Sequence, residues 1–319
     1  NKNYSTLPYD VAYGDAYAYL KGYLNSETNN VVPELSVPNS GFSIPKETPF
    51  ILEGSATPSN DNYLFSWEQN DASSTSFCMD LTNSADECSG LSNWPSDEGP
   101  LFSTIDLNNN GSMRYFPAMS SLLNNQYSTT YDDYGTILTV ERLPFGTREL
   151  NMRLQVRTNE LEAGSVNFKN VKFLVDGNSG PFRVTSQSES TSWNSQSTQT
   201  ITWDAANTDQ PPINCTNVDI FLSTDAGRNF NTLIAENISN DGSHDITVPI
   251  MASMDSCRIM VKASDNIFFD INNAYISIIN NKVPNIDLSM NQAQTELIVS
   301  NNGEFGSVLS FKLNFIDSI

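Results

Sequence analysis

The sequence predicts an all-β fold, and three observations support this prediction. The 319 residues are rich in Asn, Ser and Thr and poor in Lys and Ala, a balance that favours strands and turns over helices. Short segments alternate apolar and polar residues, as in 150–157 (LNMRLQVR), where the period of two is that of a half-buried strand. Clusters of turn residues, such as 59–62 and 240–244, separate these segments.

Composition and charge narrow the class of protein. Hydrophobic residues make up 38% of the chain, enough to fill the cores of two or three domains. The formal net charge of -21, from 37 acidic and 16 basic residues, repels phosphate backbones and argues against a nucleic-acid partner. No apolar run reaches the length of a membrane-spanning helix, so we expect no membrane span. The chain lacks an initiator Met and a signal peptide, and we expect it to start inside a longer precursor.

The first half of the chain divides into a helical tail and a sandwich. Residues 1–32 carry apolar and aromatic residues at spacings of three and four, which predicts a short helix at the end of a preceding domain. Residues 33–177 predict a first β-sandwich. Its predicted strands include 50–52, 63–67, 150–157 and 171–175, and a polar loop covers 72–98.

The second half of the chain predicts a second sandwich and part of a third β domain. A Gly- and Pro-containing linker at 176–181 is followed by six short strands within residues 178–280, which fits one immunoglobulin-like sandwich. These strands are 182–184, 199–203, 218–222, 245–248, 257–261 and 274–278. Residues 281–319 predict two strands, 295–299 and 308–315, of an incomplete domain. The predicted fold is therefore a tandem of immunoglobulin-like or fibronectin-like β-sandwiches.

Four cysteines fall into two regional pairs. Cys78 and Cys88 share the polar loop, and Cys215 and Cys257 share the second sandwich. An even count paired by region predicts two local disulfides in an oxidising compartment. The alternative is four buried free thiols.

Two groups of carboxylates are candidate calcium ligands. Asp61, Glu68 and Asp71 flank one predicted strand, while Asp265 and Asp270 flank a short apolar segment. Carboxylate oxygens at the edge of a sandwich are the ligands by which many extracellular modules hold calcium. The alternative is that these side chains only cap turns.

One tryptophan is a candidate ligand-binding residue. Trp94 lies in the polar loop, where an exposed indole could stack on a glycan or contact a peptide. Trp67 and Trp203 lie in strand patterns and are expected in the cores.

The chain offers no complete active site. It contains one histidine, His244, in a predicted turn, and neither a zinc site nor a Ser-His-Asp triad can be built around it. We therefore assign no catalytic residue.

An ordered series of short segments carries a family resemblance. Examples are 44–50 (IPKETPF), 52–57 (LEGSAT), 65–69 (FSWEQ), 114–117 (RYFP), 200–204 (TITWD) and 218–225 (VDIFLSTD). Together these segments resemble the region downstream of the catalytic domain in secreted, reprolysin-like zinc metallopeptidases of Bacteroidetes-type bacteria. Residues 283–319 resemble the opening of a type IX secretion sorting domain, with Met290-Asn291-Gln292 where that family has Asn-Pro.

The resemblance implies a function for the whole chain. It would be a non-catalytic accessory region that positions a catalytic domain and binds a protein or peptide substrate, or a surface. Residues 1–32 would then be the tail of that catalytic domain, and zinc would belong only to the parent enzyme. The resemblance also implies secretion-machinery partners and a secreted or outer-cell-surface location. The alternative is a cell-surface adhesion, structural or glycan-binding module without protease activity.

Overall fold

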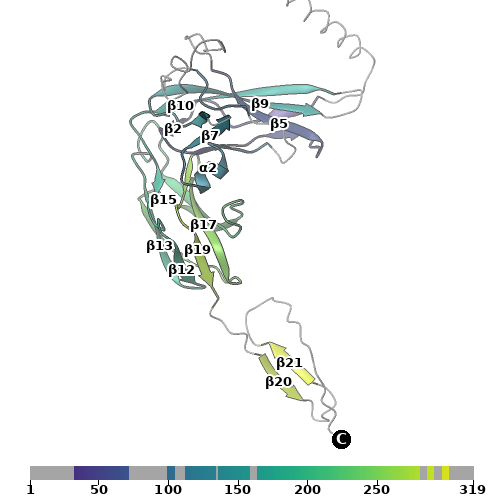
Figure 1. The fold of residues 1–319 in the computed structure, drawn as a ribbon, viewed down its shortest axis with the longest axis vertical. Coiled ribbons are helices and arrows are strands. Elements are labelled where there is room, and N and C mark those ends of the chain that lie inside the picture. Colours follow the sequence, from purple (N-terminus) through teal and green to yellow (C-terminus); the bar gives the residue numbers. More distant parts are fainter. Residues whose placement is uncertain are drawn as a thin grey trace, which may run out of the picture.

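The computed structural model describes residues 32–71, 99–104, 112–133, 136–158, 164–280, 286–290 and 297–301. Strands dominate these ranges, and the one helix among them is the short α2 (Met119–Leu123) (Figure 1). The all-β fold predicted from the sequence is confirmed. The helix predicted within 1–32 and the strand predicted at 308–315 lie outside the described residues.

A four-stranded sheet forms one layer of the first sandwich. Its strands, in spatial order, are β2 (Ser43–Pro45), β10 (Val166–Asp176), β9 (Arg148–Thr158) and β5 (Tyr63–Gln69). Along β9 every second side chain is buried, as its alternating sequence predicts. The long β9–β10 ladder therefore presents one apolar face to the core.

Three short strand pairs complete the first sandwich. They are β1 (Glu34–Ser36) with β4 (Ser55–Thr57), β3 (Phe50–Leu52) with β6 (Arg114–Phe116), and β7 (Ser128–Asp133) with β8 (Thr136–Arg142). Phe50 is fully buried at the centre, stacked on Phe116 and edge-on to Phe102 and Phe173. Such aromatic packing contributes energy beyond the burial of apolar area.

The second sandwich has the topology of an immunoglobulin-like domain. One sheet contains β11 (Arg183–Val184), β13 (Thr198–Asp204) and β16 (Ser243–Thr247). The other contains β12 (Thr191–Asn194), β19 (Ile276–Ile279), β17 (Met254–Ala263), β14 (Asn217–Ser223) and β15 (Thr232–Ser239), with β18 (Phe269–Ile271) also paired to β17. The chain crosses between the two sheets at each step from β11 to β14 and again on both sides of β16, and β12 runs parallel to the last strand of the sandwich, β19.

Each sandwich has its own core. The buried residues of one core come from 35–175, and those of the other come from 182–278. Near the end of the chain, β20 (Ile286–Met290) and β21 (Leu297–Asn301) form an antiparallel pair, which includes part of the strand predicted at 295–299.

The structure corrects the predicted disulfide between Cys215 and Cys257, because both are buried free thiols. They lie at opposite ends of the β14–β17 ladder, which runs from the pair Val218–Ala263 to the pair Ser223–Arg258. Five residues of strand span ~16 Å, whereas a disulfide needs Cα atoms about 4–7 Å apart. For this pair the alternative of free thiols is correct, and Cys78 and Cys88 lie outside the described residues.

Candidate functional site at the junction of the sandwiches

Backbone hydrogen bonds join the two sandwiches edge to edge. The N–H of Ile51 on β3 donates to the carbonyl of Ile267 at 2.9 Å, and the N–H of Phe269 donates to the carbonyl of Pro49 at 3.0 Å. Phe50 and Phe268 face each other between these bonds as an antiparallel bridge. The β17–β18 hairpin of the second sandwich thus continues the β3–β6 pair of the first. We call these contacts the junction ladder.

Apolar side chains from both sandwiches pack around the junction ladder. Ile51 and Leu122 of the first sandwich form a buried cluster with Met260, Phe269 and Ile271 of the second. This cluster is separate from the two cores and removes apolar surface from water at the domain boundary. The junction is therefore packed like a protein interior.

Polar contacts also cross the junction. The side chain of Arg258 donates to the carbonyl of Leu123 at 2.7 Å, and the N–H of Phe182 donates to the hydroxyl of Thr48 at 3.0 Å. Two residues of the predicted linker are buried, Asp176 at 5% and Ser179 at 3% exposed, whereas Asn178 is exposed. The segment between the sandwiches is therefore part of the packed structure.

Asp270 is a fully buried carboxyl at this junction. Its Oδ2 accepts from the N–H of Val184 at 2.8 Å, and its Oδ1 accepts from the hydroxyl of Tyr127 at 3.2 Å. Burial raises the pKa of Asp270 to about 7, although the nearby charge of Arg183 lowers it. Asp265, predicted to share a calcium site with Asp270, is an exposed turn residue on the other side of the apolar segment.

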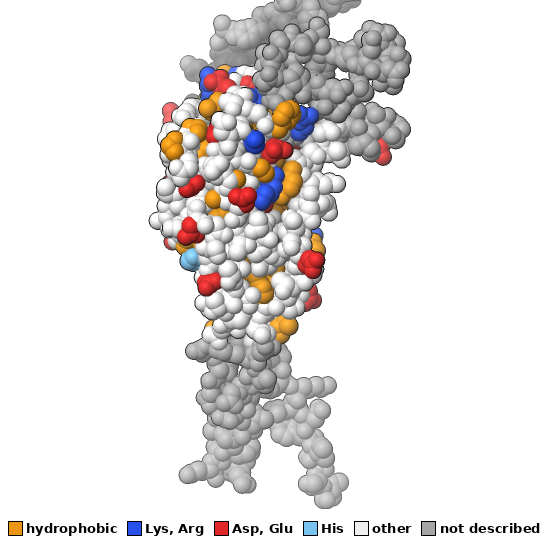
Figure 2. Space-filling model, turned by 90° about the vertical axis from the view of Figure 1, so that its left-hand side faces the viewer, with side chains coloured by type: hydrophobic (Ala, Val, Ile, Leu, Met, Phe, Trp, Pro, Cys, Tyr) orange, Lys and Arg blue, Asp and Glu red, His pale blue; other side chains and the backbone are white. Residues whose placement is uncertain are grey.

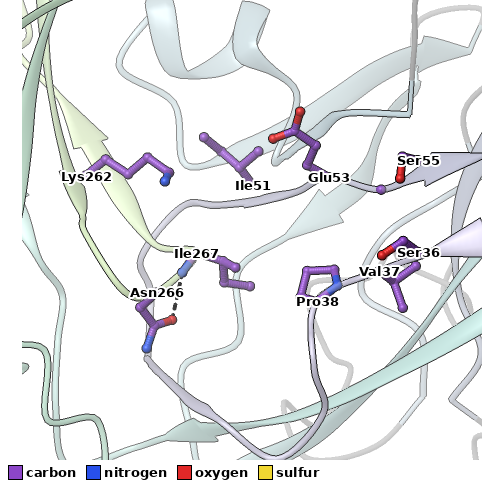
Figure 3. A pocket seen from close by; sticks show the side chains of 10 residues that line it. Ser36, Val37, Pro38, Ile51, Glu53, Ser55, Lys262, Asn266 and Ile267 are labelled. Carbon is purple, nitrogen blue, oxygen red and sulfur yellow. Dashed lines mark hydrogen bonds between the residues drawn. The ribbon is translucent and has the colours of Figure 1, made fainter.

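An open groove of about 480 Å³ lies beside the junction ladder (Figure 3). Its apolar lining includes Val37, Pro38 and Ile51 from the first sandwich and Ile267 from the second. Clefts between domains are common places for ligand sites, because each domain can supply part of the surface. We call this cleft the junction groove.

Two opposite charges from different sandwiches line the junction groove. Figure 3 draws Glu53 and Lys262 on either side of Ile51. Neither side chain forms an ion pair within the part of the chain that the structure describes. The Tyr115 pKa is raised mainly by burial and also by the negative charge of Glu53. The groove therefore carries a carboxylate and an ammonium group that are available to a ligand.

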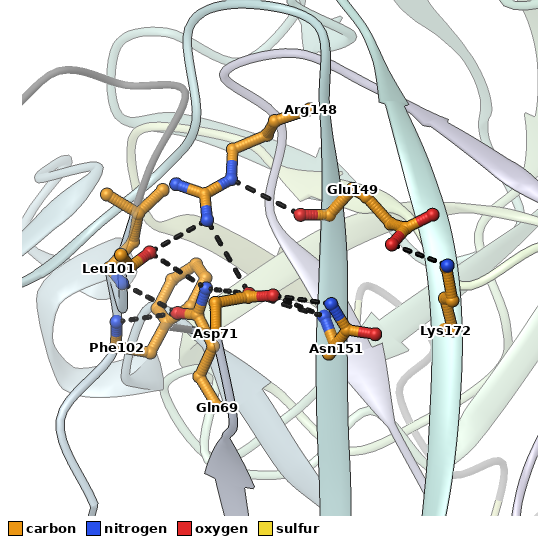
Figure 4. Close-up of polar contacts among 9 residues, drawn as sticks. Gln69, Asp71, Leu101, Phe102, Arg148, Glu149, Asn151 and Lys172 are labelled. Carbon is orange, nitrogen blue, oxygen red and sulfur yellow. Dashed lines mark hydrogen bonds and ion pairs between the residues drawn. The ribbon is translucent and has the colours of Figure 1, made fainter. Parts of the chain in front are cut away.

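A buried polar network fixes the chain on both sides of the 72–98 segment (Figure 4). Asp71 accepts from the side-chain amide of Asn151 at 2.6 Å and forms a 3.5 Å ion pair with Arg148. Arg148 also donates to the carbonyl of Gly99 at 2.7 Å. The side-chain oxygen of Gln69 accepts from the backbone N–H groups of Leu101 and Phe102. The described residues that flank the 72–98 segment, 69–71 and 99–102, are thus held together at one place on the sandwich.

The structure does not gather the predicted calcium ligands. Asp61 precedes β5 and is exposed, whereas Asp71 follows the other end of the same strand and is engaged in the polar network. Glu68 lies on β5 between them. Within the described ranges, no group of three or more His, Cys, Asp or Glu side chains could hold a metal ion. Calcium binding by these residues stays a prediction, and Trp94 lies outside the described residues.

Sequence reasoning missed the charges and the buried polar groups that the fold brings together. Glu53 and Lys262 are more than 200 residues apart, and no local pattern indicates that they share a groove. Lys262 does interrupt the apolar run 259–263, and this is the one signal that could have marked it. His244, predicted in a turn, lies on β16 opposite Ile201 and does not line the junction groove.

Comparisons with known proteins support no family assignment. No family model matches the chain, and no curated protein matches it. Matching solved structures include the titin domains z1z2 in complex with telethonin, at 10% identity and a TM-score of 0.21, over 80% of this chain and 100% of that one. The teleost fish polymeric Ig receptor ectodomain matches at 8% identity and a TM-score of 0.21, over 78% of this chain and 100% of that one. The N-terminal four Ig domains of a Dscam1 isoform match at 10% identity and a TM-score of 0.25, over 78% of this chain and 54% of that one.

The fold class therefore rests on the sheets and not on these low scores. The packed sheets and their strand order define β-sandwiches of the immunoglobulin-like class. The junction ladder joins the two sandwiches into one tandem module. Within the described ranges, no helix is long and apolar enough to cross a membrane.

Proposed function

We propose that this chain is a rigid, non-catalytic module that positions other parts of a secreted protein and binds a partner. The junction ladder is the observation that carries this proposal, because its backbone bonds tie an edge of one sandwich to an edge of the other. Domains in one chain usually move relative to each other unless a large apolar interface holds them. The buried apolar cluster around Ile51 and Phe269 supports a fixed arrangement of the two sandwiches.

Relaxation of backbone amide ¹⁵N nuclei tests the rigidity of the module. We expect the amides of 43–71 and 182–278 to report one rotational correlation time, as for a single body. Two distinct times, one for each sandwich, would contradict the proposal. The measurement uses the full chain and needs no label at the junction.

The resemblance to secreted reprolysin-like metallopeptidases supports a zinc metallopeptidase as the parent protein. In that parent, the module would position the catalytic domain and bind its substrate or a surface. The test is the intact mass and zinc content of the protein isolated from its native source. A mass well above 35.3 kDa with one zinc per chain supports the metallopeptidase. A mass near 35.3 kDa without zinc favours the alternative, an adhesive or glycan-binding module.

A further inference from the structure

We propose that the junction groove binds an extended peptide in which a basic and an acidic side chain flank apolar residues. This inference rests on the proposed function as a binding module and names its class of partner. Three features of the groove support it: its two separate charges, its preformed apolar surface and its rigid polar wall.

The charges favour a ligand that carries both signs. Glu53 and Lys262 come from different sandwiches, and neither forms an ion pair with any described residue. A single anion would meet Lys262 but would be repelled by Glu53, in a chain whose net charge is already -21 and whose acidic side chains are scattered over the face drawn in Figure 2. A ligand with one positive and one negative group can pair with both, and such complementarity also fixes the direction in which it binds.

The apolar part of the groove is formed before any ligand arrives. Ile51 is only 9% exposed, and its backbone is bonded to Ile267 in the junction ladder. Val37 and Pro38 complete the apolar lining from the other side. The volume of about 480 Å³ lies within the range of ~300–1,000 Å³ typical of ligand sites. It can therefore hold a few apolar side chains without rearrangement of the sandwiches.

Hydroxyl groups and a constrained glycine form the remaining wall. Ser36 and Ser55 pair with each other across β1 and β4, and both are exposed at the groove. Their hydroxyls are suited to the backbone N–H and C=O groups of an extended peptide. A Cβ at Gly54 would collide with the side chain of Leu154 and the carbonyl of Ser36, so this wall has no space for a larger residue.

Asn266 holds the opposite wall in place. Its side-chain amide donates to the carbonyl of Ser43 at 2.9 Å, and its side-chain oxygen accepts from the N–H of Ile267 at 2.8 Å. The first bond ties the β17–β18 turn to the first sandwich, and the second orders the turn itself. The fold therefore sets the backbone position of Lys262 relative to that of Glu53, as a preorganised binding site for a charged ligand requires.

Fluorescence anisotropy with short peptides tests the proposal. The probes are three capped, fluorescein-labelled tetrapeptides with an Ile-Val centre: one with Lys first and Glu last, one with the reverse order, and one with Gln at both ends. We expect one charged order to bind more tightly than the other two. Glu53→Gln and Lys262→Met should each weaken that binding by about tenfold. The double variant Glu53→Lys/Lys262→Glu should prefer the reverse order.

A matched control and a structural readout complete the experiment. The exposed ion pair of Lys172 and Glu149 lies on the β9–β10 sheet and not in the groove. Charge removal there, by Glu149→Gln/Lys172→Met, should leave peptide affinity unchanged. Amide shifts of Ile51 and Ile267 on titration should locate the peptide in the groove.

The results separate this inference from the proposed function. The inference is overturned if neither charged peptide binds, or if one binds and Glu53→Gln and Lys262→Met leave its affinity unchanged. If a single correlation time is found together with either result, the rigid module stands and only the peptide site fails. If two correlation times are found, the proposed function itself fails.

Discussion

The hydroxyl of Tyr127, in the first sandwich, lies 3.2 Å from Oδ1 of Asp270, in the second. The other carboxylate oxygen of Asp270 accepts from the N–H of Val184 at 2.8 Å. The guanidinium carbon of Arg183 lies 3.7 Å from the centre of the Tyr127 ring. One fully buried carboxyl therefore connects the two sandwiches, and its protonation should affect how firmly they are joined.

This arrangement predicts a pH dependence of stability. Burial raises the pKa of Asp270 from its ordinary value of 3.8 to about 7. Between these two pH values, Asp270 is ionised in the unfolded chain but protonated in the folded protein. The contribution of Asp270 to the free energy of unfolding therefore falls as pH rises from about 4 to about 7. Asp270→Asn cannot ionise and should lack that decline.

Urea unfolding of both proteins at several pH values measures this effect. The urea concentration at the unfolding midpoint of Asp270→Asn, minus that of the unmodified protein, should increase from pH 4.5 to pH 7.5. Parallel pH profiles for the two proteins would show that Asp270 does not titrate differently on folding.

Ile51→Pro should uncouple the sandwiches without unfolding either of them. Proline has no N–H, so the bond to Ile267 in the junction ladder is lost. We expect two rotational correlation times in ¹⁵N relaxation, where the unmodified protein gives one. Ile51→Ala keeps the N–H and serves as the control for loss of the side chain. Equal behaviour of the two variants would mean that packing, and not the backbone bond, governs the junction.

Asp71→Ala should destabilise the first sandwich by about 2 kcal/mol. The substitution removes the acceptor for Asn151 and the carboxylate that is paired with the buried side chain of Arg148. The neighbouring ion pair of Lys172 and Glu149 is half exposed, so Glu149→Gln should cost less than about 1 kcal/mol. Denaturant midpoints measure both changes. Equal effects of the two substitutions would contradict a special role for the buried network.

Cys215 and Cys257 should resist alkylation in the folded protein. Burial raises the pKa of each thiol to about 11, so very little thiolate is present at pH 8. Iodoacetamide should modify both residues in urea without prior reduction, and neither in buffer. Peptide mass spectrometry distinguishes them from Cys78 and Cys88. A peptide pair that is linked through Cys215 and Cys257 would restore the original disulfide prediction.

Local pattern was enough to find most of the described strands of the second sandwich. Strands such as β14 alternate buried and partly exposed side chains, and this signal is carried within a few residues. β15 was missed because it is largely exposed and its sequence, TLIAENIS, shows no clean alternation. The helix α2 was missed because five residues are too few to show a period of 3.6.

The junction could not be predicted from the sequence because its contacts are not local. Ile51 and Ile267 are brought together by tertiary packing alone. The sequence also did not show that Asp61 and Asp71 stand at the two ends of β5 rather than at one edge, so calcium binding there stays a prediction. The Cys215–Cys257 prediction failed for the same reason, since pairing by region does not specify register.

The junction ladder gives the two sandwiches a second connection in addition to the covalent one at 176–181. A tensile force that separates the sandwiches would therefore be divided between a continuous polypeptide and a short set of parallel hydrogen bonds at Ile51 and Phe269. The hydrogen-bonded path would rupture first and the covalent path would then extend. This order of events would lengthen the chain by a small and reversible amount before either sandwich loses its own sheets.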